Sequence, residues 1–126
     1  MKPIRLIAAA FAAIAMLASG LAAAQQPIKV GIGIAQTGPL GGGGKAALLA
    51  LNMWVDDVNA KGGLLGRKVQ LIAYDYLLNA AATTEIYTKL LDVDKVDLIV
   101  SGYASTQIAP AVPIAMQRNK VFVTLF

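Results

Sequence analysis

The chain has 126 residues, enough for one small domain, and 57% of them are hydrophobic. It contains no histidine and no cysteine, which removes the commonest catalytic bases, nucleophiles and zinc ligands and excludes disulfides. Eleven basic residues outnumber seven acidic ones, but they are scattered along the sequence, so a nucleic-acid-binding surface is not expected. The composition therefore gives little support for an enzyme, a metal site or a bound cofactor.

Residues 1–24 have the pattern of a secretory signal peptide. Lys2 and Arg5 precede an uncharged run over residues 6–24, and this run ends in three alanines. A membrane-spanning anchor is the alternative, because the run is nearly long enough, but its alanine and glycine content gives a weak drive into lipid. We therefore predict export and cleavage after Ala24. An exported domain without disulfides fits a bacterial periplasm better than a small extracellular module.

Apolar runs and turn residues divide the rest of the chain into alternating strands and helices. We predict strands at residues 28–35, 68–74, 96–100 and 121–125, and helices at residues 45–59, 80–91 and 107–118. This alternation with short links predicts an α/β fold with a parallel, doubly wound sheet and right-handed crossovers. Because no helix follows the fourth strand, we expect residues 25–126 to form an incomplete lobe.

Individual residues predict how the helices begin and what they bury. Asn79 is the expected N-cap of the second helix, while Pro110 and Pro113 suggest that the third helix starts late or kinks. The side chains expected to turn inward from the second helix are Ala82, Ile86, Leu90 and Leu91. In the first helix, the predicted apolar stripe contains Leu48, Leu51, Val55 and Val58. The neighbouring residues Leu49, Met53 and Trp54 are expected to pack in the core or between lobes.

The stretch TGPLGGGGK, residues 37–45, raises the question of a phosphate-binding loop. A P-loop would need glycine at Pro39 and a hydroxyl at Ala46, so the pattern fails twice. A dinucleotide fingerprint also fails, because Gln36 stands where its third glycine is required. We predict instead that residues 36–44 form a mobile loop at the mouth of a binding site, and a simple spacer is the alternative.

The carboxylates do not form an evident catalytic group. Asp75 ends a strand but has no evident partner in the sequence, so it is expected to have no chemical role. The residues expected to be solvated charge around a turn are Asp92, Asp94 and Asp97.

Three loops are expected at the carboxyl ends of the parallel strands, where open α/β sheets bind ligands. They cover residues 36–44, 75–79 and 101–106. In the third loop, Ser105 and Thr106 lie at the start of a helix and could hold a carboxylate with their hydroxyls and the unpaired backbone N–H groups. Ordinary helix capping is the alternative.

Several spaced motifs resemble one family. They include Thr37-Gly38-Pro39, VNAKGG at residues 58–63, LGRK at residues 65–68, and KVDLIV followed by Tyr103-Ala104-Ser105. In this order they are similar to the periplasmic leucine/isoleucine/valine-binding proteins, the type I solute-binding proteins of ABC importers. The resemblance covers residues 28–126. It implies two lobes that close around a solute, of which this chain would supply the first part of the N-terminal lobe.

The resemblance also implies site residues. Ser105 and Ala104 match the positions that hold the solute carboxylate, and Phe126 falls near another contact. Gly43 matches a position often occupied by a larger residue that faces the solute, so the pocket is expected to be roomier or differently shaped. The candidate ligand-binding residues are Gly43, Tyr103, Ala104, Ser105, Thr106 and Phe126. Tyr76, where many relatives have a second aspartate, is a further departure from the pattern.

The resemblance implies a periplasmic solute-binding protein that is not an enzyme and needs no cofactor. Its partners would be a small-molecule solute and the membrane permease of an ABC importer. The solute would bear a carboxylate, and an amino acid, an amide or an organic or aromatic acid all remain open. One alternative is a ligand-sensing domain of the same fold in a regulator or receptor. Another is an exported α/β enzyme with a catalytic group beyond Phe126.

Overall fold

The structure is a computed structural model that describes residues 25–124. The predicted signal peptide, residues 1–24, and the candidate Phe126 lie outside the described residues. The elements in chain order are β1 (Ile28–Gly33), α2 (Gly41–Ala60), β2 (Val69–Tyr74), α3 (Ala80–Asp92), β3 (Leu98–Val100), α4 (Ser105–Gln117) and β4 (Val121–Val123). Within residues 25–124, no helix has the length and hydrophobicity needed to cross a membrane.

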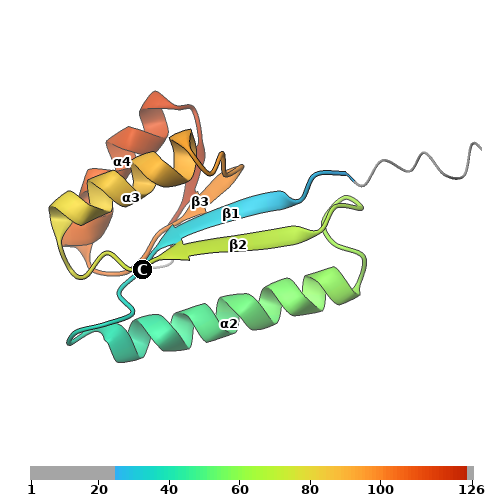
Figure 1. Ribbon diagram of the computed structural model, residues 1–126, viewed down its shortest axis with the longest axis horizontal. Coiled ribbons are helices and arrows are strands. Elements are labelled where there is room, and N and C mark those ends of the chain that lie inside the picture. Colours follow the sequence, from blue (N-terminus) through green and yellow to red (C-terminus); the bar gives the residue numbers. More distant parts are fainter. Residues whose placement is uncertain (1–24, 125–126) are drawn as a thin grey trace, which may run out of the picture.

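The four strands form one parallel sheet in the order β2-β1-β3-β4. Helix α2 lies against one face of this sheet, while α3 and α4 lie against the other (Figure 1). The predicted α/β fold with a parallel, doubly wound sheet is therefore confirmed. The chain leaves β1 toward β2 on one side and returns to β3 on the other, so the strand order reverses between β1 and β3. This reversal point is where doubly wound sheets bind ligands.

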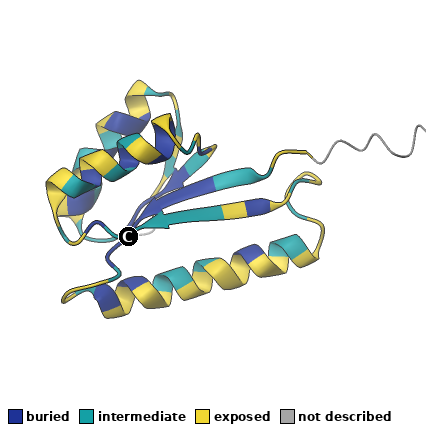
Figure 2. Cartoon of the chain, in the orientation of Figure 1, coloured by how far each residue is buried: buried dark blue, intermediate teal, exposed yellow. Residues whose placement is uncertain are grey.

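Strand β1 separates two apolar cores, and its alternating side chains fit both. Val30 and Ile32 are buried on the α2 face. On the other face, a Cβ added to Gly31 would lie 3.1 Å from Leu90, and one added to Gly33 would lie 3.0 Å from the ring of Tyr87. These glycines let α3 pack close to the sheet, because any larger residue would push the helix away. Figure 2 shows the buried part of β1 between helices whose outer faces are exposed, while β2 is mostly half-buried.

The glycine run forms the first turn of α2, so the prediction of a loop is wrong for Gly41 to Gly44. The helix begins early because its first turn packs on the chain that leaves β1. The N–H of Gly44 donates to the carbonyl of Leu40, and a Cβ added to Gly44 would lie only 1.5 Å from the oxygen of Ala35. Glycine is required here by a close backbone approach, which outweighs its low helix propensity.

Helix α4 begins at Ser105, two residues before the predicted start at residue 107. Pro110 and Pro113 both lie inside it, so the expectation of a late start is wrong. Ser105 is helical and makes no side-chain cap, because the residue at the cap position is Ala104. The reading of Ser105 as an ordinary N-cap is therefore not supported.

Burial corrects two further predictions. Asn79 caps α3 as expected, because its side-chain oxygen accepts a hydrogen bond from the N–H of Ala81. However, α3 buries Thr83 and Tyr87 completely, and neither was expected to face inward. On α2, Leu49 and Met53 are each 63% exposed, so they do not pack in the core, while packing between lobes stays a prediction. The predicted stripe of Leu48, Leu51, Val55 and Val58 packs on the sheet and is confirmed.

Candidate functional site

Asp75 joins the loops that follow β1 and β2. Its carboxylate accepts hydrogen bonds from the N–H of Gln36 (3.1 Å), the hydroxyl of Thr37 (2.7 Å) and the N–H of Leu77 (2.9 Å). Burial raises the pKa of Asp75, but these hydrogen bonds outweigh it and hold the pKa below the usual 3.8. These partners were not evident from the sequence, and through them Asp75 fixes the two loops.

Two tyrosines join the third loop to the others. The hydroxyl of Tyr76 donates to the carbonyl of Tyr103 at 2.6 Å, and the hydroxyl of Tyr103 donates to the carbonyl of Leu40. Burial raises the pKa of Tyr76, although hydrogen bonding to backbone groups partly offsets this effect. Gly102 allows the close packing, because a Cβ there would lie 2.2 Å from the oxygen of Gly33 and 2.8 Å from the Tyr76 ring.

A third tyrosine holds the ends of β1 and β3 together from within the core. The hydroxyl of Tyr87 lies 3.3–3.4 Å from backbone N–H or carbonyl groups of Gly33, Val100 and Gly102. The side chain is 1% exposed, and burial raises the pKa of its hydroxyl. This hydroxyl satisfies backbone groups at the reversal point of the sheet, where the two strands separate.

The N-terminus of α4 opens at the same edge of the sheet. Ala104 has φ 82° and ψ 115°, a conformation that alanine rarely adopts. Its carbonyl accepts hydrogen bonds from the N–H groups of Gln107 (2.9 Å) and Ile108 (3.1 Å). Within residues 25–124, the N–H groups of Ala104, Ser105 and Thr106 have no protein acceptor. Ser105 and Thr106 are exposed, and the first turn of α4 carries no acidic residue. These donors and the helix dipole can bind an anion.

The structure brings five of the six candidate residues to one region. Ala104, Ser105 and Thr106 follow Tyr103 directly, and Gly43 lies against the Tyr103 side chain, whose oxygen would be 2.6 Å from a Cβ added at residue 43. Sequence reasoning did not assign a site role to Asp75, Tyr76 or Tyr87, which hold the loops in place. Ligand contacts by the candidates stay a prediction.

Asp92 and Asp97 are exposed, in agreement with the expectation of solvated charge, and each also has a specific partner. Asp92 forms a two-pronged ion pair with Arg118, with distances of 2.6 and 2.7 Å. This hydrogen bonding holds the pKa of Asp92 below its usual value. Asp97 accepts a hydrogen bond from the N–H of Lys29 at 2.8 Å. Among residues 25–124, no group of three potential metal ligands is arranged to hold an ion.

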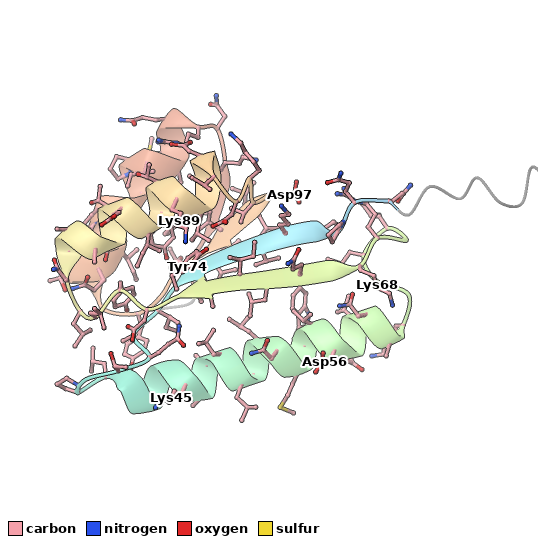
Figure 3. The ribbon with its side chains drawn as sticks, viewed as in Figure 1. Lys45, Asp56, Lys68, Tyr74, Lys89 and Asp97 are labelled. Atoms are coloured by element: carbon pink, nitrogen blue, oxygen red, sulfur yellow. The ribbon has the colours of Figure 1, made fainter. Side chains whose placement is uncertain are left out.

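Asp94 belongs to a polar cluster between β2 and α3. Its carboxylate accepts a hydrogen bond from the hydroxyl of Tyr74 at 3.1 Å. The ammonium nitrogen of Lys89 lies 4.0 Å from the centroid of the Tyr74 ring, as the two labelled side chains in Figure 3 indicate. The neighbouring Tyr74 side chain and, to a smaller extent, the Asp94 carboxylate raise the pKa of Lys89. These contacts between Tyr74, Lys89 and Asp94 belong to the packing of the fold and lie outside the candidate site.

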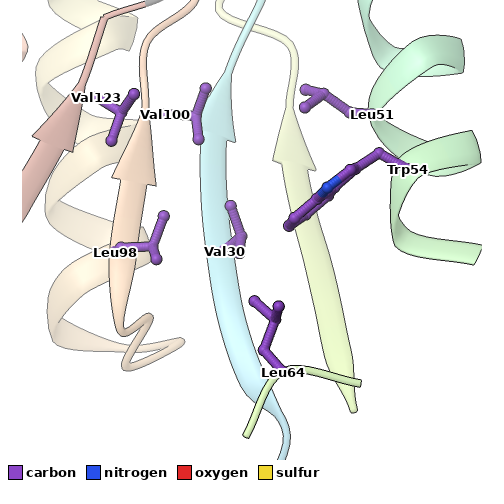
Figure 4. A pocket seen from close by; sticks show the side chains of 7 residues that line it. All are labelled: Val30, Leu51, Trp54, Leu64, Leu98, Val100 and Val123. Atoms are coloured by element: carbon purple, nitrogen blue, oxygen red, sulfur yellow. The ribbon is translucent and has the colours of Figure 1, made fainter. Parts of the chain in front are cut away.

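A groove on the α2 face of the sheet is a separate feature (Figure 4). Six of its seven lining side chains are aliphatic, and the seventh is that of Trp54. The lining residues are Val30, Leu51, Trp54, Leu64, Leu98, Val100 and Val123. None of these side chains is charged, so the groove is poorly suited to a carboxylate, and the edge formed by the three loops is the better candidate.

Comparison with known proteins identifies relatives of the whole described region. A family model described as "Periplasmic binding protein" matches residues 27–126. The Leu/Ile/Val-binding protein of Escherichia coli (strain K12) is 28% identical over 111 residues, which is 88% of this chain and 30% of that protein. Leu/Ile/Val-binding protein homolog 7 of Brucella abortus (strain 2308) is 34% identical over 92 residues, which is 73% of this chain and 23% of that protein.

A solved structure agrees with these matches. The branched-chain amino acid transporter substrate binding protein of Streptococcus pneumoniae, in complex with isoleucine, superposes with a TM-score of 0.74 at 26% sequence identity. The match covers 78% of this chain and 28% of that one, so the chain spans less than a third of these relatives. The relatives are named as binding proteins, in agreement with the expected resemblance to the Leu/Ile/Val-binding proteins. The chain therefore belongs to the periplasmic binding protein family.

Proposed function

We propose that this protein is the periplasmic solute-binding component of an ABC importer and that it captures a small carboxylate-bearing solute at the carboxyl edge of its sheet. The solute carboxylate would bind at Ala104, Ser105 and Thr106, with Tyr103 and Gly43 beside it and Phe126 near another part of the solute. The observation that carries the proposal is the exposed N-terminus of α4, with three backbone donors that have no acceptor within residues 25–124.

The chemistry of this helix end favours an anion. Backbone N–H groups and the hydroxyls of Ser105 and Thr106 can donate hydrogen bonds, and the helix dipole adds partial positive charge. A hydrogen bond to a charged group contributes about 1.5–3 kcal/mol. Two such bonds are enough to distinguish a carboxylate from its uncharged carboxamide by more than tenfold in affinity.

The nature of the solute is narrowed by the side chains at this edge. Gly43, Tyr103 and Ala104 carry no charge, and neither do Ser105 and Thr106. A charged partner for the ammonium group of an amino acid would therefore have to come from outside these residues, while an organic or aromatic acid needs none. The relative from S. pneumoniae was crystallised with isoleucine, which supports a carboxylate-bearing ligand without fixing the rest of its structure.

The proposal includes export, lobe closure and delivery to a membrane permease. Signal cleavage after Ala24 would leave a mature chain that begins at Gln25, which N-terminal sequencing of the periplasmic protein can check. Closure of a second lobe would exclude water and strengthen the carboxylate interactions. The closed form would then be recognised by the permease.

Isothermal titration calorimetry tests the binding proposal on the protein as its natural host produces it. The probes are L-isoleucine, L-leucine, benzoate and butyrate, each compared with its carboxamide. We expect at least one carboxylate to bind, with its carboxamide at least tenfold weaker. Ser105→Ala should raise the dissociation constant of that carboxylate about tenfold, because it removes one donor to a charged group.

Thr84→Ala is the matched control, since Thr84 is an exposed hydroxyl on α3 that bonds only to the carbonyl of Ala80 in its own helix. The dissociation constant of the Thr84→Ala variant for that carboxylate should stay within about twofold of the wild-type value. The proposal is wrong if no carboxylate binds or if carboxamides bind equally well. Equal affinity in Ser105→Ala and wild type would remove Ser105 from the site.

A further inference from the structure

Tyr76 is a buried polar residue that packs against the third loop, residues 101–106. Its side chain is 1% exposed and follows β2, at the edge where the three loops meet. The ring packs on the backbone of Gly102, where a Cβ would lie 2.8 Å from Cε1 of Tyr76. This packing leaves the phenol little freedom, so the hydroxyl is held in a fixed place against the third loop.

The hydroxyl of Tyr76 donates to the carbonyl of Tyr103 at 2.6 Å, which is within the range of a good O–H···O hydrogen bond. That carbonyl shares its peptide group with the N–H of Ala104. The group is planar and trans, because residues 25–124 contain no cis peptide, so its C=O and N–H point in opposite directions. When Tyr76 fixes the carbonyl, it also fixes the direction of the Ala104 N–H.

The backbone conformation of Ala104 explains why the Tyr103–Ala104 peptide has to be held in place. Ala104 has φ 82°, a region that residues with a Cβ disfavour, and such a conformation persists only where the surroundings hold it. Rotation of the Tyr103–Ala104 peptide would relieve it and would turn the Ala104 N–H away from those of Ser105 and Thr106. The Tyr76 hydroxyl donates to this peptide from outside the third loop.

We infer that Tyr76 is a positioning residue for carboxylate recognition, which holds the Tyr103–Ala104 peptide so that the Ala104 N–H is aligned with the N-terminus of α4. The inference rests on the proposed function and deepens it. Tyr76 does not touch the solute. Tyr76 affects affinity through one backbone donor, the N–H of Ala104. Loss of the Tyr76 hydroxyl should therefore weaken the binding of carboxylates and not that of their carboxamides.

Tyr76→Phe tests this role, because it keeps the ring and removes only the hydroxyl. Tyr74→Phe is a matched control two residues earlier, at the end of β2, since the Tyr74 hydroxyl bonds to Asp94 outside the site. The four carboxylates above and their carboxamides are titrated into the wild-type protein and both variants. The preference for carboxylate over carboxamide should fall about tenfold in Tyr76→Phe and change less than about twofold in Tyr74→Phe.

A second measurement does not depend on ligand binding. The ¹³C resonance of the Tyr103 carbonyl and the ¹⁵N resonance of Ala104 should shift in Tyr76→Phe and stay unchanged in Tyr74→Phe. An unchanged preference in Tyr76→Phe overturns the inference, and so does an equal loss of affinity for carboxylates and carboxamides. A wild-type protein with no carboxylate preference overturns the proposed function itself, and the inference with it.

Discussion

Replacing single glycines in the first turn of α2 with alanine should have opposite effects at neighbouring positions. A Cβ added to Gly42 meets no atom within 4 Å, while one added to Gly44 would lie 1.5 Å from the oxygen and 2.7 Å from the carbon of the Ala35 carbonyl. Both residues are helical, so alanine improves the helix propensity equally at each. The difference between the two variants therefore measures the packing of the helix start against β1.

The expected magnitudes follow from these contacts. Gly42→Ala should raise the free energy of unfolding by about 0.5–1 kcal/mol, because alanine restricts the unfolded chain and favours the helix. Gly44→Ala should lower it by more than about 3 kcal/mol, since the overlap is with backbone that cannot rotate away. Gly43→Ala should fall between them, because its Cβ would meet the Tyr103 hydroxyl, which can move.

Urea unfolding followed by far-ultraviolet circular dichroism measures the three free energies, and thermal unfolding gives an independent check. A change of 1 kcal/mol corresponds to about 4–8 °C in melting temperature for a domain of this size. If Gly42→Ala were destabilising and Gly44→Ala neutral, the glycine run would not form the helix start and the reasoning would be refuted. Equal effects at both positions would refute it as well.

Three further predictions use other contacts. Leu65 is 92% exposed, has φ 51° and precedes Gly66 in a two-residue turn. Leu65→Asn should therefore raise the free energy of unfolding, measured in urea, by about 1 kcal/mol. A lower free energy of unfolding in this variant would contradict the turn. Tyr87→Phe should lower it by about 1–2 kcal/mol, because buried N–H groups lose a partner, and no loss would mean that the hydroxyl contacts are unimportant. Arg118→Gln should raise the pKa of Asp92 toward 3.8 in an NMR titration. In the wild-type protein the Asp92–Arg118 pair stabilises the fold above pH 3.8 and loses this effect as the pH falls through the lowered pKa of Asp92. An unchanged pKa of Asp92 in Arg118→Gln would contradict the pairing.

Local sequence signals predicted the strands, because β-branched and apolar runs such as the one in β1 are typical of buried parallel strands. Asn79 was also predictable, since N-capping depends on neighbouring residues only. The glycine turn of α2 was not, because propensity argues against it and the decisive contact with Ala35 is tertiary. Tyr87 was missed because an amphipathic pattern assigns a residue with a polar group to the surface, unless its partners are known.

The candidate site was less predictable than the fold. Ser105 and Thr106 could be placed near a helix start, but their interpretation as ligand-binding residues depended on a family resemblance. Two of the three partners of Asp75 lie 38 and 39 residues away in the sequence, and only the folded sheet brings them to it. The backbone of Ala104 was also beyond sequence reasoning, because alanine gives no signal for a positive φ.

The most direct test of carboxylate binding at this edge is a titration of the ¹⁵N-labelled protein with the tightest-binding carboxylate, followed through its backbone amide resonances. The account predicts that the N–H resonances of Ala104, Ser105 and Thr106 move downfield together and saturate with the calorimetric affinity. Movement of the Trp54 indole N–H instead, with these three unchanged, would place binding in the apolar groove and contradict the account.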